Sequence, residues 1–90
     1  MTKIELLNEL TQRITEANEK KIASTYTLIY DKSIDLLMST SKLVKEDKVS
    51  EVHSKGVSLG QFAIKIMEDV DFEYSSKLCN TSEHLENYSK

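Results

Sequence analysis

The sequence predicts an all-α fold, an antiparallel bundle of about three helices that dimerises through helical packing. Its 90 residues contain no proline and only two glycines, whereas an all-β chain of this length needs many turn-forming residues. Hydrophobic side chains recur at helical spacing through most of the chain. A chain this short buries only about 60% of its unfolded surface, so self-association would add stability.

The first helix is expected over residues 2–18. Thr2 and Glu5 have the spacing of a capping box, in which the threonine hydroxyl and the glutamate carboxylate each accept a backbone N–H from the other residue. Behind them, apolar side chains follow heptad spacing at Ile4, Leu7, Leu10, Ile14 and Ala17. A straight continuation would turn Lys21 inward, so we expect a kink or short break at residues 18–21.

The second helix is expected over residues 21–45. Its apolar side chains form a wide girdle instead of one narrow stripe, which indicates contacts on more than one side. The polar residues 45–48 are the expected loop, and Asp47 is the candidate N-cap of the next helix.

The third helix is expected over residues 48–79, and it carries the clearest pattern in the chain. At 100° per residue, a stripe at alternating steps of three and four runs along one face of it. Small residues in such a stripe let another helix backbone approach closely. The stripe would contact either the second helix or a second copy of the chain. The predicted interaction seam consists of Val52, Gly56, Leu59, Gly60, Ala63, Ile66 and Val70.

Residues 1–79 are therefore expected to form one helical domain, followed by a polar, acidic and frayed tail at 80–90. Residues 1–67 carry ten Lys/Arg and nine Asp/Glu, a balance of +1, whereas residues 68–90 carry two lysines and six acids, a balance of −4. Without a basic stripe, nucleic-acid binding is not expected, and DNA-associated regulation is the weakest hypothesis. No apolar run approaches the roughly 20 residues of a membrane span.

The single cysteine, Cys79, excludes an intrachain disulfide and is typical of a reducing compartment. The N-terminus has alternating charges and no apolar signal segment, so we expect a cytoplasmic protein. The candidate soft metal ligands are Cys79, His53 and His84, and their spacing matches no zinc pattern. Neither a metal nor a cofactor is therefore expected. The Ile/Lys/Asn/Ser-rich usage suggests an AT-rich bacterial or phage genome.

No enzymatic activity is expected, because the chain has no nucleophile elbow, Gly-rich loop or P-loop. Long amphipathic helices with a surplus of apolar positions instead favour a small module that binds another protein, such as an adaptor, chaperone, immunity protein or regulator. Exposed aromatic side chains are common anchors for a partner. The candidate anchors are Phe62, Phe72 and Tyr74.

The alternative function centres on His53. The segment His53–Gly60, HSKGVSLG, resembles the signature of histidine phosphotransfer domains, which are small helical bundles with a phosphoacceptor histidine on a helix. That family has the form H-x-x-K-G, whereas here Lys55 and Gly56 come one residue earlier, a rotation of about 100° on a helix. The resemblance implies that His53 is the phosphoacceptor. The competing interpretation is a histidine packed at the edge of the seam.

Overall fold

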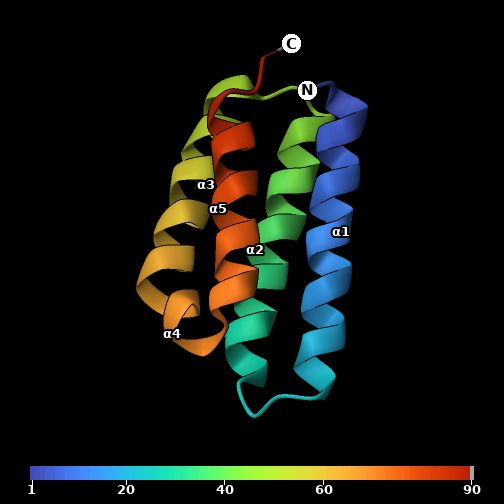
Figure 1. The fold of residues 1–90 in the computed structure, drawn as a ribbon. Coiled ribbons are helices and arrows are strands. Elements are labelled where there is room, and N and C mark those ends of the chain that lie inside the picture. The colour runs from blue at the N-terminus through green and yellow to red at the C-terminus, as the bar shows by residue number, and fades with distance from the viewer. Residues whose placement is uncertain (90) are drawn as a thin grey trace.

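The computed structural model describes residues 1–89, and within them helices are the only regular secondary structure, which confirms the all-α prediction. It has four long helices where three were expected. A π-helical segment, η1 (Ala63–Met67), and a short helix, α4 (Glu68–Val70), continue the third of them. Figure 1 shows the four helices side by side, with consecutive helices running in opposite directions. The long helices are α1 (Lys3–Ile22), α2 (Thr27–Lys45), α3 (Val49–Phe62) and α5 (Phe72–Glu86).

The capping box at the start of α1 is present. The Thr2 hydroxyl accepts the Glu5 N–H at 3.1 Å, and the Glu5 carboxylate accepts the Thr2 N–H at 2.8 Å. The break expected at residues 18–21 lies further along the chain: α1 continues to Ile22, and α2 begins at Thr27 instead of residue 21. Both lysines at the expected break reach carboxylates at the surface: Lys20 Nζ lies 2.9 Å from Asp71 and Lys21 Nζ lies 2.6 Å from Asp31. Their long aliphatic stems let the charged ends leave the packed face, so the helix need not end there.

The expected third helix is divided at Asp71. This residue is extended, with φ −155° and ψ 90°, and its carboxylate accepts the Tyr74 N–H at 3.0 Å as the N-cap of α5. Aspartate is among the best N-cap residues, because its carboxylate satisfies an N–H that the first helical turn leaves without a partner. The single helix predicted over 48–79 is therefore wrong: α3, η1 and α4 run down one side of the bundle and α5 returns beside them (Figure 1).

The sequence suggested Asp47 as the N-cap of the third helix, but Asp47 does not cap α3. Lys48 occupies the N-cap position, and Asp47 precedes it in the left-handed region, with φ 56°. The Asp47 carboxylate instead accepts the Tyr88 hydroxyl at 2.8 Å and the Lys3 ammonium at 3.1 Å. This residue therefore ties the α2–α3 loop to the start of α1 and to the segment that follows α5, which lie at the same end of the bundle in Figure 1.

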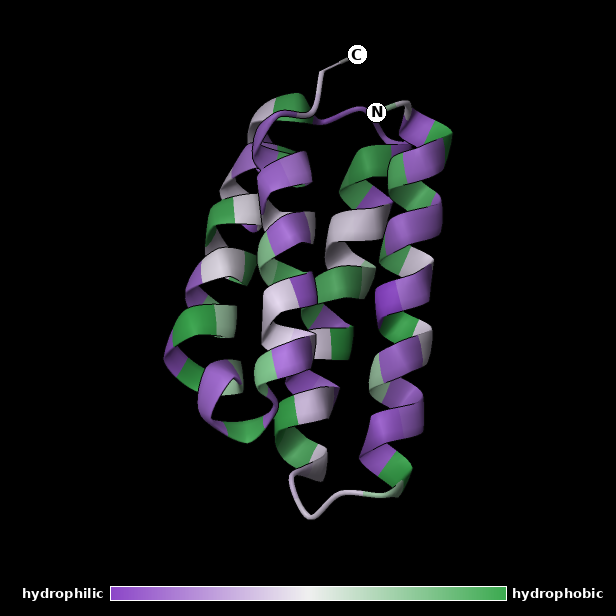
Figure 2. Ribbon diagram, in the orientation of Figure 1, coloured by the Kyte–Doolittle hydropathy of each residue, from purple (hydrophilic) through white to green (hydrophobic). Residues whose placement is uncertain are grey.

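The core is formed by the inward faces of all four long helices. Figure 2 shows green and purple segments alternating along each helix, as amphipathic helices require. The α1/α2 and α3/α5 pairs pack most extensively, and α2 contacts α3 less. Within residues 1–89, no helix is long and apolar enough to cross a membrane.

The segment after residue 79 contributes to this core. It was expected to be a frayed tail, but α5 runs to Glu86, and Leu85 and Tyr88 are buried. Thr81 and Ser82 also face inward, so the polar composition that suggested fraying is partly the composition of a helix–helix contact.

Candidate functional site

The predicted seam with its two glycines faces α5. A Cβ atom at Gly56 would lie 2.9 Å from Leu85 Cβ and 3.1 Å from the backbone nitrogen of Glu86. At Gly60 it would lie 2.7 Å from Ser82 Oγ. The two helices therefore approach as closely as the small residues suggested, but the contact is within the chain and involves the last helix instead of the second.

Two serines of α5 hold this crossing in register. Ser82 Oγ donates to the Gly56 carbonyl at 2.6 Å, and Ser75 Oγ donates to the Ala63 carbonyl at 2.8 Å. The serines are seven residues apart, as are their acceptors, so the same contact repeats after two helical turns. The stripe with Gly56 and Ala63 on this face of α3 and η1 is therefore occupied by α5 of the same chain.

The seam leaves the core at its far end. Ile66 is 37% exposed and Val70 is half-buried, whereas Met67 is fully buried. A π-helical turn holds more residues than an α-helical one, so η1 rotates the residues that follow it away from the stripe drawn at 100° per residue. Among the remaining seam residues, Val52, Gly56, Leu59 and Ala63 are buried and Gly60 is half-buried.

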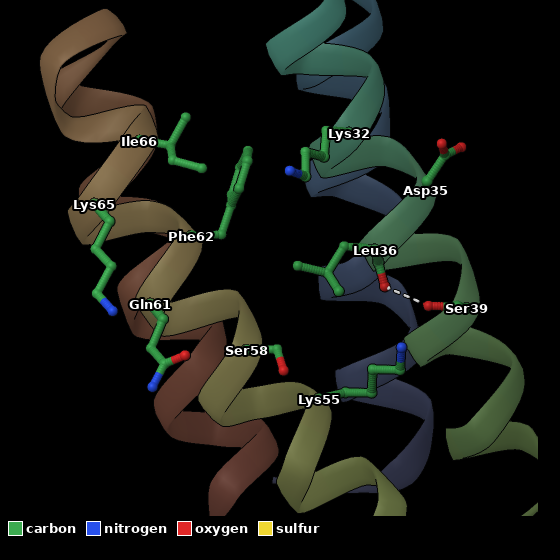
Figure 3. A pocket seen from close by; sticks show the side chains of 10 residues that line it. All are labelled: Lys32, Asp35, Leu36, Ser39, Lys55, Ser58, Gln61, Phe62, Lys65 and Ile66. Atoms are coloured by element: carbon green, nitrogen blue, oxygen red, sulfur yellow. Dashed lines mark hydrogen bonds between the residues drawn. The ribbon is translucent and has the colours of Figure 1, made fainter.

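An open groove lies between α2 and α3, where the two helices pack less extensively. It has a volume of about 510 Å³. Figure 3 shows the side chain of Leu36 pointing from α2 toward α3, with Phe62 and Ile66 pointing into the same space from the other wall. The groove is lined by Lys32, Asp35, Leu36 and Ser39 from α2, Lys55, Ser58, Gln61 and Phe62 from α3, and Lys65 and Ile66 from η1.

The groove combines an apolar floor with a basic rim. Leu36, Phe62 and Ile66 form the floor. Lys32, Lys55 and Lys65 make no ion pair with any residue from 1 to 89, in contrast to the lysines of α1, which all do. Asp35 is the one acidic side chain among the lining residues. Cations beside an apolar floor suit a partner that is both apolar and anionic.

A second hollow of about 470 Å³ extends the groove toward the α2–α3 loop. It shares Lys55 and Ser58 with the first and adds Leu43 from α2 and Glu51 and Ser54 from α3. On α2 the lining positions 32, 35, 36, 39 and 43 follow helical spacing, so one stripe of the helix faces the groove. This groove was not predicted from the sequence, although the wide apolar girdle of the second helix was a signal for it.

The three candidate aromatic anchors lie in different surroundings. Phe62 is 7% exposed in the groove floor, and Phe72 is 67% exposed at the start of α5. Tyr74 is fully buried, and its hydroxyl donates to the Arg13 carbonyl at 2.7 Å. Burial raises the pKa of Tyr74. Tyr74 is therefore a core residue here, and a partner cannot reach it without unfolding the bundle.

Asp71 joins three helices. Besides capping α5, its carboxylate accepts the Tyr30 hydroxyl at 2.9 Å and pairs with Lys20 at 2.9 Å. Burial opposes the charged form, but the hydrogen bonds from the Tyr74 N–H, Lys20 and Tyr30 outweigh it and lower the pKa of Asp71. Burial and the bond to Asp71 raise the pKa of Tyr30 to about 12. This cluster stabilises the turn between α4 and α5.

His53 makes a structural hydrogen bond. Its Nε2 lies 2.6 Å from the Tyr88 carbonyl, and because a carbonyl oxygen can only accept, Nε2 must carry the proton. That nitrogen has no free lone pair for a phosphoryl group while the bond persists. His84 contacts Glu9 at 2.9 Å, and Cys79 is half-buried. Among residues 1–89, no three His, Cys, Asp or Glu side chains are grouped to hold a metal ion.

No protein-family model matches the chain, and neither the curated proteins nor the solved structures contain a significant match.

Proposed function

We propose that this chain is a small, non-enzymatic helical module that binds another protein through the α2/α3 groove, in the class of adaptors, chaperones, immunity proteins and regulators. One observation carries the proposal: an apolar floor lies open beside three lysines that have no ion-pair partner within residues 1–89. A reducing, cytoplasmic location is part of the proposal and rests on the lone cysteine.

The groove suits recognition of a macromolecule more than that of a small metabolite. It is an elongated surface between two helices, which is the form of site into which an amphipathic helix fits. Ile66 in its floor is 37% exposed, so binding would remove apolar surface from water. No observation at His53 favours the phosphotransfer alternative: its Nε2 bonds to the Tyr88 carbonyl of the same chain, which leaves the lone pair on Nδ1.

Ile66 and Ile64 offer a matched test of the proposed site. Both are exposed and both belong to η1, but only Ile66 lines the α2/α3 groove. Tagged wild-type protein and the variants Ile66→Glu and Ile64→Glu are used to capture proteins from the lysate of the natural host. We expect a stoichiometric partner that Ile64→Glu retains and Ile66→Glu loses. A partner lost equally with both variants, or retained with both, would place the binding surface elsewhere.

We also propose that the chain forms a homodimer, and that it associates through the end of the bundle that carries the α1–α2 loop and the α4–α5 turn (Figure 1). The support is the exposure of large apolar side chains there: Ile22 is 88% exposed, Leu28 81% and Phe72 67%. Large apolar side chains that gather in water at one end of a bundle favour association, since association removes them from water. Sedimentation equilibrium should give a dimer for wild type and a monomer for Leu28→Ser/Phe72→Ser. A monomeric wild type would refute the dimer without affecting the groove.

A further inference from the structure

The rim of the α2/α3 groove is basic although the whole chain has a net charge of −3. Figure 3 shows Lys32 and Lys55 extending into the groove from opposite walls, and Lys65 lies on the η1 wall near Ile66. Against these three cations the groove has two acids, Asp35 in the first hollow and Glu51 in the second, so the balance over both hollows is +3 − 2 = +1. Such a balance raises the local concentration of an anionic partner and disfavours a cationic one.

From this balance and the apolar floor, we propose that the occupant is an acidic amphipathic helix of another protein, a partner class that rests on the function proposed above. The lining positions of α2 extend from Lys32 to Leu43, which at 1.5 Å per residue is about 17 Å, or roughly three helical turns. A helix of this length places apolar side chains at i, i+3, i+4 and i+7 over Leu36, Phe62 and Ile66. Asp and Glu on its flanks then meet the lysines of both walls.

A second copy of this chain fits the groove less well. In a symmetric dimer the same patch occurs on both subunits, so groove against groove would bring Lys32, Lys55 and Lys65 toward the same three cations. Like charges facing each other oppose association. An acidic helix neutralises the lysines instead, and Lys32 and Lys55 reach it from either side.

The test uses three synthetic, fluorescently labelled helical peptides of about 14 residues, long enough to cover the groove. The first has a leucine face flanked by glutamates, the second has lysines in place of the glutamates, and the third has serines in place of the leucines. Fluorescence anisotropy gives their dissociation constants for wild-type protein at low and high ionic strength. The protein variants are Lys32→Glu/Lys65→Glu in the groove and Lys42→Glu/Lys45→Glu, an equal charge change on α2 outside it. Circular dichroism confirms that each variant is folded.

We expect only the glutamate–leucine peptide to bind wild type, and to bind more weakly as salt screens the lysines. Lys32→Glu/Lys65→Glu should weaken it at least about tenfold, the loss expected for two exposed charge pairs, whereas the control should change it by about twofold or less. Equal binding of the lysine peptide would overturn the acidic partner class. So would failure of all three peptides. In either case, a captured partner that Ile66→Glu loses would leave the proposed function standing, and absence of such a partner would refute both.

Discussion

Gly56 is the position where a single added side chain should damage this fold most clearly. A Cβ there would lie 2.9 Å from Leu85 Cβ and 3.1 Å from the Glu86 nitrogen, and real Cβ atoms essentially never come within 3.0 Å of another atom. Neither neighbour is the flexible end of a side chain, so α5 must move as a whole. We therefore expect Gly56→Leu to separate α3 from α5.

The magnitude follows from three contributions. Overpacking a tight contact costs about 1–3 kcal/mol, and a leucine at this distance belongs at the upper end. Separating the helices also breaks the bond from Ser82 Oγ to the Gly56 carbonyl, which contributes about 1 kcal/mol. Replacing a helical glycine by leucine raises the free energy of unfolding by about 1 kcal/mol through its higher helix propensity, which offsets part of this loss. The free energy of unfolding should fall by about 3 kcal/mol, which lowers Tm by about 12–24 °C in a domain of this size.

Urea unfolding followed by circular dichroism measures this change, because the chain has no tryptophan to report by fluorescence. Val57→Leu is the matched control, since Val57 is the next residue of α3 and is 45% exposed. It should change the free energy of unfolding by less than about 0.5 kcal/mol. If Gly56→Leu were as stable as Val57→Leu, the close α3/α5 crossing would be refuted.

Three further changes test the contacts around this crossing and the α4–α5 turn. Gly60→Ala should destabilise the wild-type protein, but it should destabilise the Ser82→Ala variant much less, because the hydroxyl 2.7 Å from the new Cβ is then absent. Urea-unfolding free energies that are additive in this double-mutant cycle would contradict the contact. Asp71→Asn should lower the free energy of unfolding at neutral pH, and the difference from wild type should shrink as the pH falls. The reason is that a carboxyl whose pKa is lowered in the folded state contributes stability above its unfolded pKa and loses it as the pH falls through the folded pKa. A difference that stays constant to about pH 2 would argue against the cluster. Because the pKa of Tyr30 is raised to about 12, wild type should lose stability as the pH rises from about 10 toward 12, and Tyr30→Phe should lose less. Identical alkaline unfolding profiles of the two proteins would show that Tyr30 ionises as freely in the folded chain as in the unfolded one.

Local signals in the sequence predicted the parts of the fold that depend on neighbouring residues. The capping box at Thr2 and Glu5 forms as expected, because both partners lie within one helical turn. The close approach at Gly56 was also readable, since a glycine inside an apolar stripe leaves room for another backbone. Which helix fills that room depends on the course of the whole chain, and periodicity carries no information about it.

The misplaced helix boundaries have a common cause. The apolar spacing continues from Val70 through Tyr74, so the pattern passes over the break at Asp71. An aspartate is an N-cap signal, but the carboxylate is held there by Lys20 and Tyr30 from helices about forty or fifty residues away in the sequence. Those contacts exist only after the bundle forms.

The groove was missed for a different reason. Its two walls are separate stripes on α2 and on α3/η1, each of which resembles an ordinary solvent-exposed face with lysines. η1 then turns Ile66 outward beside Phe62 and Lys65, and nothing in the local sequence distinguishes a π-helical turn from an α-helical one. The combination becomes visible only when the two stripes are placed next to each other.

Site-specific photocrosslinking shows whether another protein occupies the α2/α3 groove. A photoreactive amino acid replaces Ser58 in the groove and, as a control, Gln12 on the exposed face of α1. After irradiation in the natural host, we expect a crosslink from position 58 to one other protein and none from position 12. If position 58 gives no crosslink, or if both positions give the same ones, the groove is not the binding site.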